Sequence, residues 1–219
     1  MTTYFSDGFE SGSFIAWSAG PIGVIGISTA SPHHGIYCTT GSRQLNTEFT
    51  GCADNLGTAY SSLYSRVYVR MGSALPATWA TCGIRLGSAA DSYIASTIVD
   101  CANNKWGLRI LNTAATSYWE TTSTMTIAAD TWYCLELYVN IAAAGTGTLW
   151  VNGVQKVTGT YDNDAAGNPR IVYCRAALNA NEAAPTVFGF DCCSYGDAYI
   201  GPEVSAVAVK RRLLMGVGL

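Results

Sequence analysis

The chain has 219 residues, of which 49% are hydrophobic, so it is long and apolar enough to bury the core of one large domain. Charged residues make up only 12%, about half the usual share, and the net charge is −3. This composition excludes the basic footprint of a nucleic-acid-binding protein, and the lack of a long apolar run predicts no transmembrane helix.

The start of the chain, MTTYFSDGFESG, lacks the basic and apolar regions of a signal peptide. We therefore expect either that a signal was removed or that the chain is made in a cytoplasm. Short strands between turn residues are then predicted at Ile22–Thr29, Ile36–Thr39 and Leu45–Phe49.

The clearest single strand is predicted at Ser61–Met71, because its side chains alternate strictly between two unlike faces. One face is mostly apolar and the other carries tyrosine and arginine. The members of the second face are Tyr64, Arg66, Tyr68 and Arg70.

Further strands are predicted in the rest of the chain, and only residues 179–184 suggest a single helical turn. These strands are Thr81–Leu86, Tyr93–Asp100, Trp106–Leu111, Tyr118–Ile127, Arg170–Ala176 and Val187–Tyr195.

The segment Thr131–Lys156 predicts a strand, an Ala/Gly loop, a second strand and a tight turn. Asn152-Gly153 is a strong hairpin signal, because a type I′ turn needs a positive φ at both central residues. Strands separated by frequent turns, with no sustained helical periodicity, predict an all-β fold built as an antiparallel β-sandwich. We divide the chain into a sandwich domain at 1–203 and a C-terminal strand or arm at 204–219.

The eight cysteines form no C-x-x-C pair, and with only two histidines they predict no zinc site. Disulfides would fit an extracellular or thermophilic setting. Cys134 is also compatible with a small core residue. Cys192 and Cys193 are neighbours on one strand and should point to opposite faces, so we expect no bond between them.

Three stretches together resemble the concanavalin A-like, or laminin G-like, jelly-roll superfamily. The opening DGFESG at 7–12 with Trp17 is similar to the first strand of many carbohydrate-binding modules. The segment from Trp132 to Gly153 resembles the tryptophan strand and turn of the superfamily. FGFD at 188–191 resembles its last strand, although Cys192 replaces a common second aspartate. The resemblance implies a concanavalin A-like jelly roll and places Trp17, Trp132 and Trp150 in the core.

The resemblance also implies a candidate calcium site that ties the first strand to the last. The matching carboxylates are Glu10 and Asp191, with Asp7 as a third ligand. Oxygen ligands suit Ca²⁺. The alternative is that these side chains cap turns or pair with arginines.

The chain has 6 Trp and 13 Tyr, and aromatic rings are the usual platforms for sugars. Tryptophans beside turns are the better candidates for carbohydrate binding, together with the polar face of the Ser61–Met71 strand. The candidates are Trp79, Trp106, Trp119, Tyr64, Tyr68, Arg66 and Arg70. The alternative for the strand face is a ladder of packed side chains or a contact with another subunit.

We expect no catalytic activity. Glycoside hydrolases need two carboxylates about 5–10 Å apart, and the tryptophan strand offers only Glu136. Lyases of similar fold use histidine and tyrosine, whereas the two histidines here, His33 and His34, lie together in a Pro/Gly turn.

The end of the chain, VSAVAVKRRLLMGVGL, places a basic cluster between apolar runs. An exposed apolar end is sticky, so it is either a last strand or an arm that docks on a neighbouring copy. The candidate self-association residues are Lys210, Arg211, Arg212, Leu213 and Leu214.

Our leading hypothesis is a non-catalytic structural or adhesive surface protein of a repeating assembly, such as a virus or phage coat, decoration or tail protein. It would associate with copies of itself or with other coat or surface subunits and reside on a virion or an extracellular surface, and contact with a glycan could coexist with that role. The first alternative is a calcium-bearing carbohydrate-binding module of a larger extracellular protein. The second is a glycan-cleaving enzyme of the same fold.

Overall fold

The computed structural model describes residues 1–47, 49–112, 117–121 and 125–203, with the backbone alone for 117–121. Strands account for nearly all of the regular structure in these residues, and no helix there is long and apolar enough to cross a membrane. The strands are β1 (Thr3–Asp7), β2 (Ala19–Ile22), β3 (Ile25–Ser28), β4 (Cys38–Arg43), β5 (Thr50–Asn55), β6 (Ser62–Met71), β7 (Trp79–Gly87), β8 (Tyr93–Asp100), β9 (Lys105–Leu111), β10 (Ser117–Thr121), β11 (Trp132–Asn140), β12 (Gly145–Val151), β13 (Val154–Tyr161), β14 (Ile171–Leu178) and β15 (Thr186–Gly196), with a 3₁₀ turn at Asp164–Ala166.

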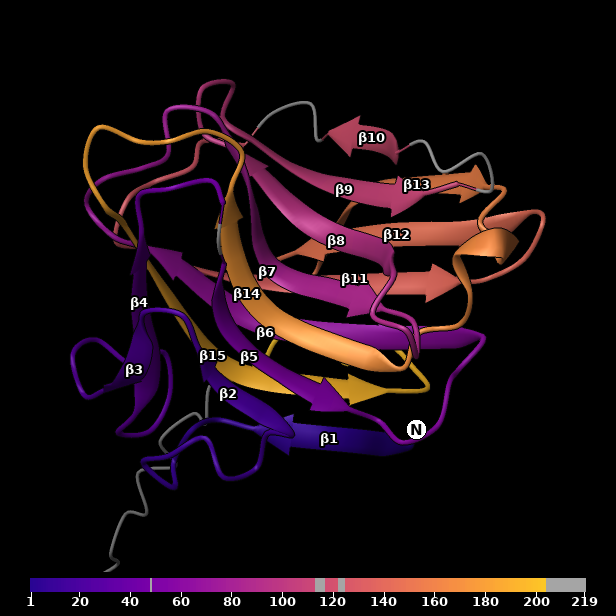
Figure 1. Cartoon of the computed structure of the whole chain (residues 1–219), viewed down its shortest axis with the longest axis horizontal. Helices are drawn as coiled ribbons and strands as arrows, with labels where there is room; N and C mark the ends of the chain where they lie inside the picture. The colour runs from indigo at the N-terminus through magenta and orange to yellow at the C-terminus, as the bar shows by residue number, and fades with distance from the viewer. Residues whose placement is uncertain (48, 113–116, 122–124, 204–219) are drawn as a thin grey trace, which may run out of the picture.

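The strands form two antiparallel sheets that stack face to face (Figure 1). The first sheet has the order β13-β12-β11-β6-β15-β4-β3, and β1 also pairs with β15. The second sheet has the order β10-β9-β8-β7-β14-β5-β2. The predicted all-β antiparallel sandwich is therefore confirmed.

The predicted central hairpin is confirmed, and it forms one half of the first sheet. Asn152 and Gly153 have φ values of 51° and 78°, as the tight turn between β12 and β13 requires. β11 pairs along its whole length with β6, the strand with the clearest alternation. Its odd-numbered residues face the core, so Leu135 and Leu137 are fully buried.

The core lies between the sheets and is built from the inward residues of both. Leu63, Val67 and Val69 of β6 meet residues such as Ile84 and Leu108 of the second sheet, all at most 1% exposed. Burial of apolar area on this scale is the main stabilising term of the fold.

Several early strands differ from the sequence-based prediction. The expected strand at 22–29 is two strands, β2 in the second sheet and β3 in the first, because the chain changes sheets at Gly23, whose φ is 69°. Residues 45–47 and 49, the described part of the strand expected at 45–49, form no strand, and β5 forms instead from Thr50–Asn55. β5 is made of small and polar residues, so its strand conformation depends on pairing with β14 rather than on intrinsic propensity.

Two other expectations are only partly met. Of the strand expected at 118–127, the structure shows β10, whereas residues 125–127 lie outside any strand and 122–124 lie outside the described residues. Residues 179–184 form bends and no helical turn.

The core tryptophans also differ in part from expectation. Trp17 is 6% exposed and packs in the core, as predicted. Trp132 and Trp150 lie on the even-numbered, outward side of β11 and β12 and are only partly buried. Trp106 is the reverse case, since it is fully buried. Side chains point alternately to the two faces of a strand, so the position of each tryptophan along its strand decides whether its ring enters the core.

Candidate functional site

The outer face of the second sheet carries a row of polar side chains that the strand register brings together. Tyr173 of β14 pairs with Arg85 of β7, Arg85 pairs with Ser96 of β8, and Ser96 pairs with Arg109 of β9. Arg175 lies two residues along β14 from Tyr173 and therefore on the same face. We call Arg85, Tyr93, Arg109, Tyr173 and Arg175 the Arg/Tyr face.

The side chains of the Arg/Tyr face pack as alternating guanidinium and aromatic groups. The Cζ atom of Arg85 lies 4.6 Å from the ring centre of Tyr173 and 5.9 Å from that of Tyr93. Arg109 lies 4.8 Å from the Tyr93 ring. These distances fall within the range of cation–π attraction, so the rings hold the guanidinium groups in fixed positions.

One carboxylate, Asp91, partly neutralises this face. Arg85 donates from Nη1 to Asp91 Oδ1 at 2.5 Å and from Nη2 to the Asp91 carbonyl at 2.9 Å. Burial alone would raise the pKa of Asp91, but hydrogen bonds from Arg85 and Tyr173 lower it. Among the five residues of this face and Asp91, the guanidinium groups outnumber the carboxylate, so these six residues together carry an excess of positive charge.

Arg175 contributes most to that excess. Its guanidinium lies 4.2 Å over the ring of Phe49, and its buried Nε has no hydrogen-bond partner in the described part of the chain. Burial and the nearby Arg85 charge lower the pKa of Arg175 to about 10, so it is still charged at neutral pH. A buried cation without a counter-ion is costly, and an anionic ligand would relieve that cost.

Both tyrosines of this face have hydroxyl groups in defined hydrogen bonds. The Tyr93 hydroxyl lies 2.8 Å from Ser96 Oγ and 3.1 Å from the Arg109 carbonyl, and burial raises its pKa to about 12. Burial and the hydrogen bond to Asp91 raise the pKa of Tyr173. The two phenols are therefore protonated at neutral pH.

The predicted Tyr/Arg face on β6 is largely covered. Residues 199–203, which follow β15, lie across the first sheet. Arg66 donates to the Gly201 carbonyl at 3.0 Å and to Glu203 at 3.1 Å, and the Glu203 N–H donates to the Tyr68 hydroxyl at 2.8 Å. Arg66 and Tyr68 are only 7% and 5% exposed, because the segment 199–203 binds over both side chains and separates them from solvent.

The other two residues of that face have local partners. Tyr64 stacks on Tyr138 at 4.3 Å between ring centres, and Arg70 forms an ion pair with Asp130 at 2.8 Å. This packed ladder is the alternative that the sequence left open.

The predicted tryptophan platforms do not form one site. Trp106 is 0% exposed in the core, so it presents no ring to solvent, which corrects that expectation. Trp79 begins β7 and is partly buried. Trp119 pairs through its backbone with Arg109, beside the Arg/Tyr face, and its side chain lies outside the described atoms.

The predicted calcium ligands do not form a cluster of metal-binding atoms in the described part of the chain, and N–H groups already bind each carboxylate. Glu10 accepts from Ile36 and Tyr37, Asp7 accepts from Phe9 and the Trp17 indole, and Asp191 accepts from His33, His34 and Cys192. Calcium would have to displace these donors, and its binding stays a prediction.

Glu136 has a structural role, because it binds the segment that follows β15. Its carboxylate is buried and accepts from the Ile200 N–H at 2.7 Å and the Gly201 N–H at 2.8 Å. Burial raises the pKa of Glu136, while these two bonds oppose that shift. The candidate self-association residues at 210–214 lie outside the described residues.

Cysteines are reduced throughout the described structure. Cys193 points into the core, with its Sγ 3.4 Å from that of Cys174, while Cys192 points outward beside Tyr68 and Cys134. The expectation that the neighbours face opposite sides is therefore met.

Comparison with solved structures identifies the architecture. The chain resembles an endo-β-1,4-glucuronan lyase from the fungus Trichoderma reesei, with a TM-score of 0.68 and 13% identity over 90% of this chain and 96% of that one. The chain has a concanavalin A-like jelly-roll fold. No family model and no curated protein matches the sequence.

Two other jelly rolls are also similar. The cellulose-induced protein Cip1 matches with a TM-score of 0.67 and 15% identity over 91% of this chain and 100% of that one. A botulinum neurotoxin type C, whose cell entry depends upon interaction with two ganglioside molecules, matches with a TM-score of 0.57 and 9% identity over 81% of this chain and 42% of that one.

The prediction that the chain is not an enzyme is wrong. It rested on the lack of paired carboxylates and of a suitably placed histidine, yet a lyase has this jelly roll over almost its whole length. The residues of the Arg/Tyr face carried no motif in the sequence. Their only signal was an arginine or tyrosine at outward positions of four strands, and this signal has no meaning until the order of the strands is known.

Proposed function

We propose that this jelly roll binds an acidic polysaccharide on the Arg/Tyr face of the second sheet. The observation that carries the proposal is Arg175, a largely buried guanidinium that stacks on Phe49 and forms no ion pair with a carboxylate of the described residues, although the charge of Asp91 lies nearby. A carboxylate of the ligand would supply that partner.

The chemistry of the face suits uronate residues. A guanidinium donates two parallel hydrogen bonds to one carboxylate, which gives both charge and orientation. The partly exposed ring of Tyr93 adds a flat surface for the apolar side of a sugar. Tyr93, Arg109 and Arg175 are partly exposed and lie on three different strands, whereas Arg85, Ser96 and Tyr173 are at most 8% exposed and support them from below.

The comparisons support this class of ligand. One similar structure is a lyase of glucuronan, and another belongs to a toxin that interacts with gangliosides. Identity to each is far too low to transfer a residue, so the proposal depends on the residues of this chain.

The test is calorimetric titration with polyglucuronate and, in parallel, with neutral dextran. We expect binding of the polyanion alone, weakening as salt screens the charges. Arg175→Met should reduce the affinity about tenfold or more, whereas Arg70→Met on the opposite sheet should leave it unchanged. Equal effects of the two substitutions, or equal binding of dextran, would refute the proposal.

A second candidate function is cleavage of that polysaccharide by β-elimination. It is favoured by the Tyr173 hydroxyl, which lies between Arg85 and Asp91 and is protonated at neutral pH. In this reaction the C5–H and C4–O4 bonds of a uronate break and a C4=C5 double bond forms. Arginine neutralises the carboxylate and so acidifies C5–H. The phenolate of Tyr173 removes the C5 proton, and the phenol so formed gives that proton to the leaving O4.

Elimination needs no oxidant or reductant, and its product absorbs in the ultraviolet. We expect absorbance to grow with polyglucuronate and to fall at least 100-fold in Tyr173→Phe. Because the Tyr173 pKa is raised, any step that needs its phenolate should accelerate toward alkaline pH. No absorbance change in the wild-type chain would leave binding as the function.

A coat, decoration or tail role in a virus or phage remains a hypothesis, together with the homo-oligomeric state and the virion or extracellular location. The lyase, Cip1 and the neurotoxin described above do not bear on it. Light scattering across a concentration series tests it, since a monomer near 23.2 kDa would reject a self-assembling protein.

A further inference from the structure

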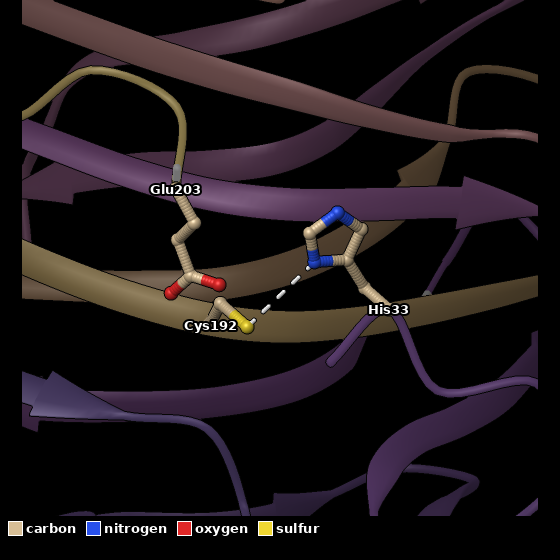
Figure 2. A group of neighbouring side chains, drawn as sticks. All are labelled: His33, Cys192 and Glu203. Carbon is tan, nitrogen blue, oxygen red and sulfur yellow. Dashed lines mark hydrogen bonds between the residues drawn. The ribbon is translucent and has the colours of Figure 1, made fainter. Parts of the chain in front are cut away.

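Three side chains with metal-binding atoms meet on the outer face of the first sheet, away from the Arg/Tyr face. Figure 2 shows His33 from the loop between β3 and β4, Cys192 from β15, and Glu203 from the segment after β15. One ligand atom from each lies within 4.8 Å of the others, and His33 Nδ1 is 3.9 Å from Cys192 Sγ. We call these residues the His-Cys-Glu cluster.

The backbone places the Cys192 thiol in this cluster. Cys192 has a φ of 48° at a bulge between Asp191 and Ser194, where β15 loses its register with β6. Such a conformation is unfavourable for a residue with a side chain. It turns the thiol outward to the cluster, while the neighbouring Cys193 enters the core.

His33 is held in place by its backbone and its ring. Its N–H donates to Asp191 Oδ2 at 2.9 Å, and its ring stacks on Tyr68 with 3.6 Å between ring centres. These two contacts hold the imidazole beside the Cys192 thiol, independently of the 3.9 Å contact between Nδ1 and Sγ.

The carboxylate of Glu203 has one oxygen satisfied and one available. Oε1 accepts from Arg66 Nη2 at 3.1 Å, whereas Oε2 is buried and has no hydrogen-bond partner in the described part of the chain. A buried acceptor without a partner is unfavourable, and a cation would satisfy it.

We propose that His33, Cys192 and Glu203 bind one divalent cation of the zinc type. Thiolate, imidazole and carboxylate are all zinc ligands, and bond lengths of about 2.0–2.3 Å imply ligand atoms ~3.3–3.8 Å apart in a tetrahedron. The present separations of up to 4.8 Å require only small side-chain movements. Thiolate and carboxylate neutralise the ion, and water or another ligand takes the fourth position.

The cation would join three segments that are far apart in the sequence. It would attach the loop containing His33 and the segment ending at Glu203 to β15, directly over Arg66 and Tyr68. The role of the cation would be to hold this loop and this segment against the first sheet. This proposal does not depend on the proposed polysaccharide binding.

The test uses the whole reduced chain, stripped with chelator and titrated with Co²⁺, which reports thiolate coordination by a charge-transfer band. We expect one equivalent of Co²⁺ to produce the band and one equivalent of Zn²⁺ to remove it by competition. Since loss of an outer partner alone typically costs 10–100-fold in metal affinity, His33→Gln should weaken Co²⁺ binding by about 100-fold or more. Cys192→Ser should abolish the charge-transfer band.

His34→Gln is the matched control, because its N–H also donates to Asp191 while its side chain is outside the cluster. It should retain the band and the affinity. His33→Gln alters a partly exposed loop residue, so its folding can be checked by circular dichroism before titration. No band in the wild-type chain, or equal losses in His33→Gln and His34→Gln, would overturn the proposal.

Discussion

Arg66 and Glu136 are register partners on β6 and β11, and they bind the two sides of the same residue, Gly201. Glu136 accepts from the Gly201 N–H, and Arg66 donates to the Gly201 carbonyl. This pair explains why residues that look available on an isolated strand are buried: they hold the segment after β15 against the first sheet.

Removing Arg66 should therefore be strongly destabilising. Arg66→Met leaves the buried Glu136 carboxylate without its cation, so we expect the free energy of unfolding to fall by about 3 kcal/mol. Arg70→Met is the matched control on the same strand, and its exposed ion pair with Asp130 should cost less than about 1 kcal/mol. Urea unfolding measures both, and similar losses would contradict the role given to Arg66.

Arg175→Met should stabilise the protein while it weakens binding of the acidic polysaccharide. The pKa of Arg175 is lowered to about 10 from 12.5, which means that folding disfavours its charged form at neutral pH. Methionine keeps the contact with Phe49 and removes the charge, so we expect a gain on the order of 1–2 kcal/mol. Thermal unfolding measures the change in stability, and calorimetric titration of the same preparation measures the change in polysaccharide affinity. A loss of stability in Arg175→Met would show that other groups of the folded protein already compensate the Arg175 charge.

Asp91→Asn should change the dependence of stability on pH. The hydrogen bonds from Arg85 and Tyr173 hold the folded pKa of Asp91 below its ordinary value of 3.8, so its stabilising contribution is present above that value and is lost as the pH falls through the lowered pKa. The wild-type chain should therefore be more stable than Asp91→Asn at neutral pH, and this difference in the free energy of unfolding should shrink as the solution is acidified. Parallel urea curves at neutral and acidic pH measure this, and a constant difference between them would argue against the ion pair.

The same substitution should strengthen binding of polyglucuronate at neutral pH, because it removes the carboxylate that faces Arg85. We expect a gain of a few-fold at low salt that disappears at high salt. Weaker binding would mean that Asp91 positions Arg85 more than it neutralises it.

Trp106→Phe should destabilise the chain without affecting its ligands. The indole is fully buried and contacts Tyr133 at 5.3 Å between ring centres, so its replacement leaves a cavity and should cost about 1–3 kcal/mol. Retention on an acidic polysaccharide should be unchanged. If Trp106→Phe lost retention on the polysaccharide while its stability was unchanged, Trp106 would have to be a binding residue after all.

Strict alternation in the sequence was enough to predict the long central strands. On β6 and β11 every second residue is apolar, with the one exception of Ser65, and these residues face the core as expected, because side chains of a strand point alternately to its two sides. The Asn152-Gly153 turn was predictable for an equally local reason. β5 was missed because TGCADN has no such pattern and becomes a strand only beside β14.

The candidate sites could not be predicted in this way. Alternation tells which residues share a face, but not which strands become neighbours or which face a later segment covers. Arg85, Arg109 and Arg175 meet only because β14 inserts between β7 and β5. His33, Cys192 and Glu203 meet only because a loop, a bulge and the segment after β15 converge.

The sequence by itself thus determined the strand periodicity, the hairpin and the all-β jelly roll, since these follow from local backbone geometry and from burial of one side of each strand. Only the tertiary structure decided where charge and metal-binding atoms gather, because those groupings depend on contacts between residues up to 170 positions apart, as between His33 and Glu203.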